Sequence, residues 1–294
     1  MNQPIRFAIF GNNCQPEKSA CIDRLLSLLR QQGSQIVMDK PFYRFLSESQ
    51  GVNLADVQII QGSDFDANVA ISLGGDGTFL EAAHRVAGKE IPILGINMGR
   101  LGFLSDFAPE EVELAVQLVS EGALQSEARS VLQVQYEGST SQNYPYALNE
   151  VAVLKRDISS MISIRVDING EYLTTYQADG LIINTPTGST GYALSVGGPI
   201  MSPDSHTLGL VPVAPHSLNV RPISLNDDVT VTLEVESRSH SFLVSIDGRS
   251  ESFQEGTRLV VRRAPYQVHV LKRPGTSYFH TLREKLMWGS DVRN

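Results

Sequence analysis

The sequence predicts an α/β domain followed by a β-rich domain. We expect a doubly wound α/β domain first, a second domain of packed sheets, and a C-terminal helix that returns to the first domain. Apolar strands alternate with helical segments in the N-terminal part, which is typical of a parallel sheet between layers of helices. Beyond it, short β-branched runs are separated by turn signals, and only the tail regains a helical period. The predicted division is 1–128 with 276–294 for the first domain and 129–275 for the second.

Changes of hydrophobic period locate the elements of the first domain. The helical period starts at Lys18 and ends near Gly33, because glycine is typical of helix C-termini. Further helices are predicted over Thr78–Ala87 and over Pro109–Ser120, where the proline suits a first turn. Short apolar runs that end at glycine or polar residues predict strands at Ile5–Phe10, Gln35–Met38, Asn68–Leu73 and Ile91–Asn97.

The second domain is predicted to consist of strands joined by tight turns. Pairs such as Asn169-Gly170 favour short hairpin turns, and long helical periodicity is scarce. The tail beyond this domain is predicted to be helical, because Phe279, Leu282 and Leu286 repeat on one face. Runs rich in β-branched residues predict strands at Val131–Tyr136, Ile162–Ile168, Leu181–Asn184, Val229–Val235, Phe242–Ile246 and Arg258–Val261.

Composition and charge exclude several classes of protein. The chain of 294 residues has a formal net charge of −8, which disfavours nucleic-acid binding by counterion release and docking on an anionic membrane. No stretch approaches the ~18 apolar residues of a membrane span. The 2 cysteines exclude a disulfide-rich secreted fold. We therefore expect a reduced, cytoplasmic protein without nucleic-acid or membrane partners.

The segment Gly74–Thr78 (GGDGT) directly follows the predicted strand NVAISL and precedes a helix. In this geometry the backbone N–H groups of a helix N-terminus can bind phosphate. Thr78 and Glu81 match a capping box, so the helix is expected to start at Thr78. The motif is neither a P-loop nor G-x-G-x-x-G. Asp76 in this turn could take a proton from an attacking hydroxyl, hold a magnesium ion, or form only a turn or a cap.

Three further segments could contact a ligand. In residues 179–192 (DGLIINTPTGSTGY) a buried strand runs into a loop of glycine and hydroxyl residues, which permits close approach and offers many donors. Residues 95–104 (GINMGRLGFL) follow another strand at the edge where α/β sheets bind ligands. Both could equally be ordinary connecting loops. Asn149-Glu150 could hold a ribose diol, although such a pair is also typical of a surface turn.

The sequence resembles the NAD kinase (ATP-NAD kinase) family over residues 68–247. The resemblance rests on five segments in order: GGDGT, GINMGRLGFLSD, NE, ADGLIINTPTGSTGYALSVGGPI and PVAPHSLNVRPI. The TPTGST block beside GGDG is highly specific, whereas diacylglycerol kinases and 6-phosphofructokinases also carry GGDG-type turns. The resemblance implies transfer of the γ-phosphoryl of ATP to the 2′-hydroxyl of the adenosine ribose of NAD, giving NADP. It also implies an α/β domain followed by a β-rich one, and we expect a cleft between them to exclude water.

The resemblance implies roles for residues at the matching positions. Asp76 is implied as the catalytic base. The sequence departs from the family pattern at Gln177 and Gly191, where relatives can carry a basic residue and an alanine respectively, so a charge contact at position 177 is in doubt. The implied ATP phosphate-binding residues are Gly74, Gly75, Gly77 and Thr78, and the implied NAD-binding residues are Asp76, Gly77, Asn149, Glu150, Ser160, Gln177, Asp179, Thr187, Thr190, Gly191, Tyr192, Ala193, Leu194, Ser195, Ala214 and Arg249.

The resemblance also implies cofactors and partners. Mg²⁺ or another divalent metal is expected, with ATP or polyphosphate as phosphoryl donor and a homodimer or homotetramer as the assembly; no metal ligand is identified. Two other functions stay open: a non-catalytic sensor of NAD or NADP, and a lipid or other small-molecule kinase of the GGDG type. A sensor has no need of a carboxylate at Asp76. A lipid kinase should lack the NE pair and the TPTGST block.

Overall fold

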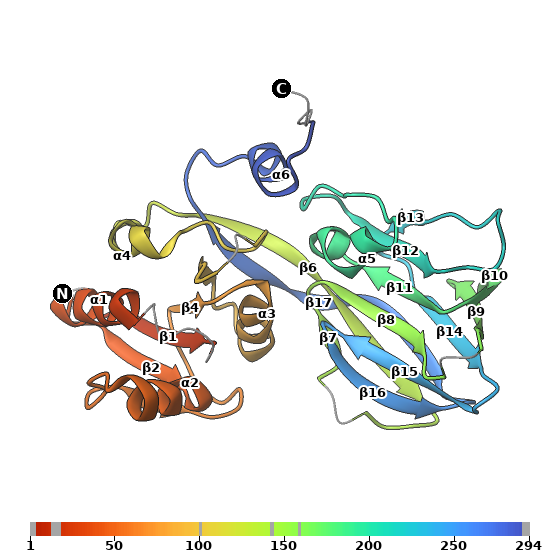
Figure 1. Ribbon diagram of the computed structural model, residues 1–294, viewed down its shortest axis with the longest axis horizontal. Helices are drawn as coiled ribbons and strands as arrows, with labels where there is room; N and C mark the ends of the chain where they lie inside the picture. The colour runs from red at the N-terminus through yellow and green to blue at the C-terminus, as the bar shows by residue number, and fades with distance from the viewer. Residues whose placement is uncertain (1–3, 13–18, 100–101, 142–143, 158–159, 290–294) are drawn as a thin grey trace. The chain divides into compact units, whose positions relative to one another are not determined.

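The chain folds into two compact units (Figure 1). The computed structural model describes residues 4–12, 19–99, 102–141, 144–157 and 160–289. Unit 1 comprises Met1–Ala128 and Val268–Asn294, and unit 2 comprises Arg129–Gln267. An α/β unit and a β-rich unit confirm the predicted fold class. The sequence prediction assigned 268–275 to the second domain, but these residues belong to unit 1, because the end of strand β17 (Arg258–Lys272) pairs with a strand there.

Unit 1 contains a parallel sheet of short apolar strands. Its order is β5-β4-β1-β2-β3, and the end of β17 pairs with β5 in the same parallel sense. Strand β4 is buried along its whole length, which is typical of a parallel sheet covered on both faces. The strands are β1 (Arg6–Gly11), β2 (Gln35–Asp39), β3 (Gln58–Ile60), β4 (Val69–Leu73) and β5 (Ile93–Ile96).

The helices of unit 1 bury their apolar faces against this sheet and one another. In α1 (Ser19–Gln31), Leu25, Leu26 and Leu29 are fully buried, and this helix packs beside α4 (Val112–Ser120). A single turn, Pro109–Glu111, precedes α4. No helix in the described ranges is long and apolar enough to cross a membrane. The other helical elements are α2 (Lys40–Phe45), a π-helical turn (Leu46–Gln50), α3 (Asp76–Arg85) and α6 (Tyr278–Leu286).

Several parts of unit 1 differ from the sequence prediction, which lacks the short strand β3. The helical segment Lys40–Gln50 was not predicted, because it is short and has no extended hydrophobic period. The tail is helical as predicted, but Phe279 is exposed, so its assignment to the packing face is wrong. Thr281 and Leu282 are the buried residues of α6. The buried face of α6 is too narrow to include both Phe279 and Leu286, which flank Leu282 in the apolar pattern.

Unit 2 consists of two antiparallel groups of strands that share one core. One sheet has the order β13-β12-β11-β8-β15-β16, and β10-β9-β14-β17 form the other group, in which β6 pairs with β17 and β7 pairs with β6. Buried residues of both groups, such as Val153 and Leu233, belong to one cluster. The strands are β6 (Gln125–Glu137), β7 (Tyr146–Ala147), β8 (Glu150–Lys155), β9 (Ile162–Ile168), β10 (Glu171–Ala178), β11 (Gly180–Asn184), β12 (Thr207–Val213), β13 (Ile223–Asn226), β14 (Val231–Glu236), β15 (Ser241–Ile246) and β16 (Arg249–Gln254).

Candidate active site

The GGDGT segment forms a tight turn between β4 and α3 in unit 1. Gly75 is the N-cap of α3, so the helix begins at Asp76 and the predicted start at Thr78 is wrong. The predicted capping box is absent, because Thr78 lies inside the first turn and its side chain packs back over Gly74. A Cβ on Gly74 would overlap the Thr78 hydroxyl, so the close packing requires glycine. The turn thus provides a helix N-terminus, whose first N–H groups lack intrahelical partners and can bind phosphate.

The carboxylate of Asp76 is fixed by the loop that follows β5. Its Oδ2 accepts a hydrogen bond from the Phe103 amide at 3.0 Å, and its Oδ1 accepts one from the Leu104 amide at 3.2 Å. A Cβ on Gly102 would overlap this carboxylate, so the approach of the loop requires glycine. The side chain is half-buried and bonds to a distant loop, which argues against a role limited to the local turn. Arg100 and Leu101 of the same loop lie outside the described residues.

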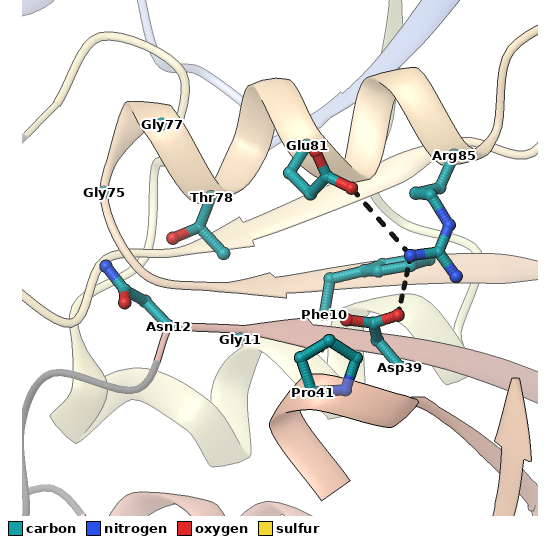
Figure 2. A pocket seen from close by; sticks show the side chains of 10 residues that line it. All are labelled: Phe10, Gly11, Asn12, Asp39, Pro41, Gly75, Gly77, Thr78, Glu81 and Arg85. Carbon is teal, nitrogen blue, oxygen red and sulfur yellow. Dashed lines mark hydrogen bonds and ion pairs between the residues drawn. The ribbon is translucent and has the colours of Figure 1, made fainter. Parts of the chain in front are cut away.

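A pocket of about 430 Å³ adjoins the glycine turn (Figure 2). The backbone of the turn and the side chains of Asn12 and Thr78 lie at one end of it. At the other end, Arg85 forms an ion pair with Asp39 at 2.6 Å and lies 3.8 Å from Glu81. Pockets of this volume hold ligands the size of a nucleotide. The pocket therefore joins the glycine turn to the carboxylates of Asp39 and Glu81.

Sequence reasoning predicted the glycine turn and Thr78 but missed the other residues that line this pocket. Asn12 and Asp39 stand at the carboxyl ends of the first two strands, where parallel sheets bind ligands, so that rule could have indicated them. Arg85 carries no comparable signal, because its partner Asp39 is distant in sequence and only the fold brings them together.

In unit 2, Asn149 and Glu150 form the centre of a second polar site. The amides of Leu148, Asn149 and Glu150 donate to the carboxylate of Asp247 at 2.7, 2.9 and 3.1 Å. Asn149 Oδ1 and Glu150 Oε2 are buried and have no hydrogen-bond partner in the described part of the chain. Burial, and then the charge of Asp247, raises the pKa of Glu150 to about 7. Two buried acceptors without partners mark a place where a hydroxyl or amide donor of a ligand can bind.

Asp247 is a further residue whose role sequence reasoning missed. Its segment was interpreted only as a hairpin turn, yet its buried carboxylate holds the backbone on which Asn149 and Glu150 stand. Burial raises the pKa of Asp247, while the three amide hydrogen bonds and the charge of Arg249 act in the opposite direction. Only the register of β8 beside β15 brings this turn to the pair.

The TPTGST block packs directly on the Asn149-Glu150 pair. A Cβ on Gly188 would overlap the Asn149 backbone, and one on Gly191 would lie 3.0 Å from Glu150 Oε2. The amide of Tyr192 donates to the Glu150 carboxylate, and the ring of Tyr192 is partly exposed. Of the residues predicted from this block, Thr187 and Thr190 lie in a 3-10 turn, and Tyr192, Ala193, Leu194 and Ser195 form α5 (Tyr192–Ser195).

Arg249 lies with this group. Its Nη2 donates to the Tyr146 carbonyl at 3.4 Å, and its charge acts on Asp247. Arg249 Nη1 is buried and has no hydrogen-bond partner in the described ranges. The structure therefore places Arg249, Asn149, Glu150 and the TPTGST block at one end of β8 and β11, where Glu150 pairs with Asn184.

The other predicted NAD contacts of unit 2 lie at the opposite end of β11. Gly180 pairs there with Leu154 and Val213, so Asp179 and Ala214 are neighbours of that end. Asp179 forms an ion pair with Lys155 at 2.7 Å. Gln177 donates to Ser163 Oγ at 2.7 Å, and Ser160 lies just before β9, its hydroxyl buried without a partner in the described part. The length of β11 separates this group from Asn149 and Glu150, roughly 13 Å at 3.3 Å per residue.

Two family models match the parts of the chain that carry the GGDGT segment and the TPTGST block. Residues 7–124 match the family model of the ATP-NAD kinase N-terminal domain, and residues 148–273 match that of the ATP-NAD kinase C-terminal domain. NAD kinase of Bacteroides fragilis (strain YCH46) is 56% identical over 98% of this chain and 100% of its own length. NAD kinase of Flavobacterium psychrophilum is 40% identical over 99% of this chain and 100% of its own length.

Solved structures share the fold. Yeast NADH kinase complexed with NADH has a TM-score of 0.89 at 22% identity, covering 100% of this chain and 90% of that chain. An NAD kinase from Archaeoglobus fulgidus in complex with ATP has a TM-score of 0.74 at 24% identity, covering 96% of this chain and 99% of that chain. With both domain models matched in order and relatives 56% and 40% identical over nearly its full length, this chain belongs to the ATP-NAD kinase family.

Proposed function

We propose that this chain is an NAD kinase in which Asp76 is the general base. Membership of the family supports the reaction: the γ-phosphoryl of ATP passes to the 2′-hydroxyl of the adenosine ribose of NAD, giving NADP and ADP. The single observation that supports the role of Asp76 is its carboxylate, fixed at the glycine turn by the amides of Phe103 and Leu104. A sensor that only binds a dinucleotide has no use for an oriented carboxylate at this position.

Asp76 acts on the acceptor hydroxyl. As the hydroxyl oxygen forms its bond to the γ-phosphorus, the bond from phosphorus to the ADP oxygen breaks, and the hydroxyl proton passes to the Asp76 carboxylate. Two amide hydrogen bonds fix the direction of the carboxylate, so little reorganisation is needed when the proton moves.

The donor ATP is assigned to the glycine turn and the adjoining pocket. The N-terminus of α3 at Gly75 suits the triphosphate, because its partial positive charge and N–H groups favour anions. The carboxylates of Asp39 and Glu81 would repel phosphate but can accept hydrogen bonds from a ribose diol. This polarity orients the donor with its phosphates at the turn and its nucleoside at Arg85.

The described residues do not build a metal site of their own. Among the described residues there is no group of three or more His, Cys, Asp or Glu side chains able to hold a metal ion. A divalent cation would therefore arrive with the donor as Mg-ATP and count as part of the substrate. No step of the mechanism is assigned to a metal held by the protein.

The acceptor NAD is assigned to the polar site of unit 2. Asn149 Oδ1 and Glu150 Oε2 are buried acceptors without partners, and ribose hydroxyls would supply the missing donors. The partly exposed ring of Tyr192 offers an aromatic surface to the adenine. Contacts from Gln177, Asp179, Ala214 and Ser160 stay a prediction, as do a cytoplasmic location and a homodimeric or homotetrameric assembly.

The proposed activity is tested by measuring NADP formation from NAD with Mg-ATP, and with polyphosphate in a parallel reaction. We expect NADP with Mg-ATP, together with equimolar ADP. Binding of NAD without NADP formation from either donor would favour the sensor alternative. Phosphorylation of diacylglycerol in vesicles without any NADP would favour the lipid kinase alternative.

A further inference from the structure

Lys285 is a partly buried ammonium group that the mechanism above does not use. It lies on α6, in the C-terminal segment of unit 1. Its Nζ donates to the Ser105 carbonyl at 3.4 Å and lies 5.6 Å from the centre of the Phe103 ring. The amides of Phe103 and Leu104 hold the Asp76 carboxylate. One short segment, Phe103–Ser105, therefore contacts both Lys285 and the proposed base.

The cations around this segment differ in whether they are paired. Lys272 forms an ion pair with Asp106 at 2.7 Å, and Arg273 forms one with Glu111 at 2.7 Å. Lys285 forms no ion pair with any described residue, and its one hydrogen bond there is the long contact with the Ser105 carbonyl. An ammonium group that has lost part of its hydration without gaining a carboxylate partner is suited to bind an anionic ligand.

Four charged groups, from α3, the loop after β5, β17 and α6 itself, act on the ammonium of Lys285. Burial, and then the charge of Lys272, lowers the pKa of Lys285 to about 8. Asp76, Asp106 and Glu284 act in the opposite direction. A phosphate bound at the ammonium would raise this pKa, so binding and protonation favour each other.

We propose that the ammonium of Lys285 binds an oxygen of the phosphoryl group that is transferred, which makes Lys285 a catalytic residue. The inference rests on the proposed function. Charge on the phosphoryl oxygens must be stabilised in the transition state, and donors fixed in a partly dehydrated site contribute most. The contact of Lys285 with the segment that orients Asp76 places a cation beside the proposed base. Asp76 would take the proton while Lys285 stabilises the charge on the oxygens.

The test compares Lys285→Gln with Arg283→Gln, which removes one positive charge from an exposed position of the same helix. We expect kcat for NADP formation at pH 7 to fall about 10²-fold in Lys285→Gln and to stay within about twofold in Arg283→Gln. Lys285→Arg should recover at least a tenth of the wild-type kcat. The dissociation constant for NAD should be unchanged, and Lys285→Gln should unfold at the same temperature as wild type or higher, because no ion pair is lost.

The pH profile of wild type provides a test that does not depend on folding of a variant. The value of kcat/KM for Mg-ATP should fall above about pH 8, and Lys285→Arg should move this fall to higher pH. A kcat in Lys285→Gln equal to that of Arg283→Gln would overturn the inference. So would a flat profile up to pH 10, or a loss of activity that only follows a lower unfolding temperature. If wild type itself makes no NADP, the proposed function has failed instead.

Discussion

At the scale of single residues, the carboxyl of Glu150 in the candidate site lies in an electrostatically unfavourable environment. Its carboxyl is buried, faces the charge of Asp247, and has one oxygen without a partner in the described part of the chain. Burial, and then the charge of Asp247, raises its pKa to about 7. A ligand hydroxyl that donates to Oε2 would stabilise the ionised form, so binding at the proposed NAD site would offset the cost of burying Glu150.

This predicts a pH-dependent effect of Glu150→Gln on stability. Because the folded-state pKa is raised, the folded protein binds the extra proton between about pH 4.5 and 7, and the stability gained below pH 4.5 is lost as the pH rises through 7. Removing the charge should therefore stabilise unit 2 at pH 8, by on the order of 2–3 kcal/mol, and change little at pH 4.5.

Urea unfolding at the two pH values, followed in Glu150→Gln and in a control, measures the effect. Glu171→Gln is the matched control, since Glu171 is an exposed glutamate of the same unit. Equal changes in the two variants at both pH values would show that burial does not perturb Glu150.

At the scale of elements, the glycine-rich loop after β5 sets the position of Asp76. Gly102 must lack a side chain because a Cβ would overlap the Asp76 carboxylate. Gly99 of the same loop has open space around its Cβ position and an ordinary backbone conformation. Position 102 therefore requires glycine and position 99 does not, a difference that the sequence pattern does not show.

Gly102→Ala and Gly99→Ala form a matched pair of variants. The first should lower kcat at least 10-fold, because the carboxylate must leave its two amide donors and misplacement of a reacting group by about 1 Å costs up to 10² in rate. The second should leave kcat within about twofold. Steady-state NADP formation by the two proteins decides this, and equal rates would contradict the proposed positioning of Asp76 by the loop.

At the scale of the whole molecule, the chain returns to unit 1 after building unit 2. Asp106 fixes this return: it pairs with Lys272 at 2.7 Å and accepts from the Arg273 amide at 3.2 Å. The side chains of Lys272 and Asp106 are 10% and 5% exposed, so the pair is buried. Removing one partner of a buried pair leaves the other charge uncompensated, which costs about 3–5 kcal/mol.

Asp106→Asn should therefore destabilise unit 1 selectively. Amide hydrogen exchange should quicken in β5 and α6 more than in β8 and β11 of unit 2. Glu113→Gln is the control, because it removes an exposed ion pair with Arg24 in the same unit and should cost less than about 1 kcal/mol. Uniform changes across both units in Asp106→Asn would show that the pair does not stabilise unit 1 locally.

The sequence predicted those parts of the site that are contiguous in the chain. The GGDGT turn, the Asn149-Glu150 pair and the TPTGST block are each read from adjacent residues, and the structure places each at the end of a strand. Asp39 with Arg85, Asp247 beneath Asn149, and Lys285 near Asp76 are brought together by sheet register and by the return of the chain. No local pattern encodes such long-range contacts. The start of α3 was misjudged because a capping-box match at Thr78 competed with the N-cap at Gly75.

The most direct test of the central claim is NADP formation from NAD and Mg-ATP by wild type and Asp76→Asn, with NAD binding measured on both. Asp66→Asn, an exposed aspartate of the same unit, serves as the control. The account predicts NADP from wild type and control, and a kcat lower by ~10²–10⁴ in Asp76→Asn at an unchanged NAD dissociation constant. An Asp76→Asn enzyme as fast as the control would contradict the assignment of Asp76 as the base.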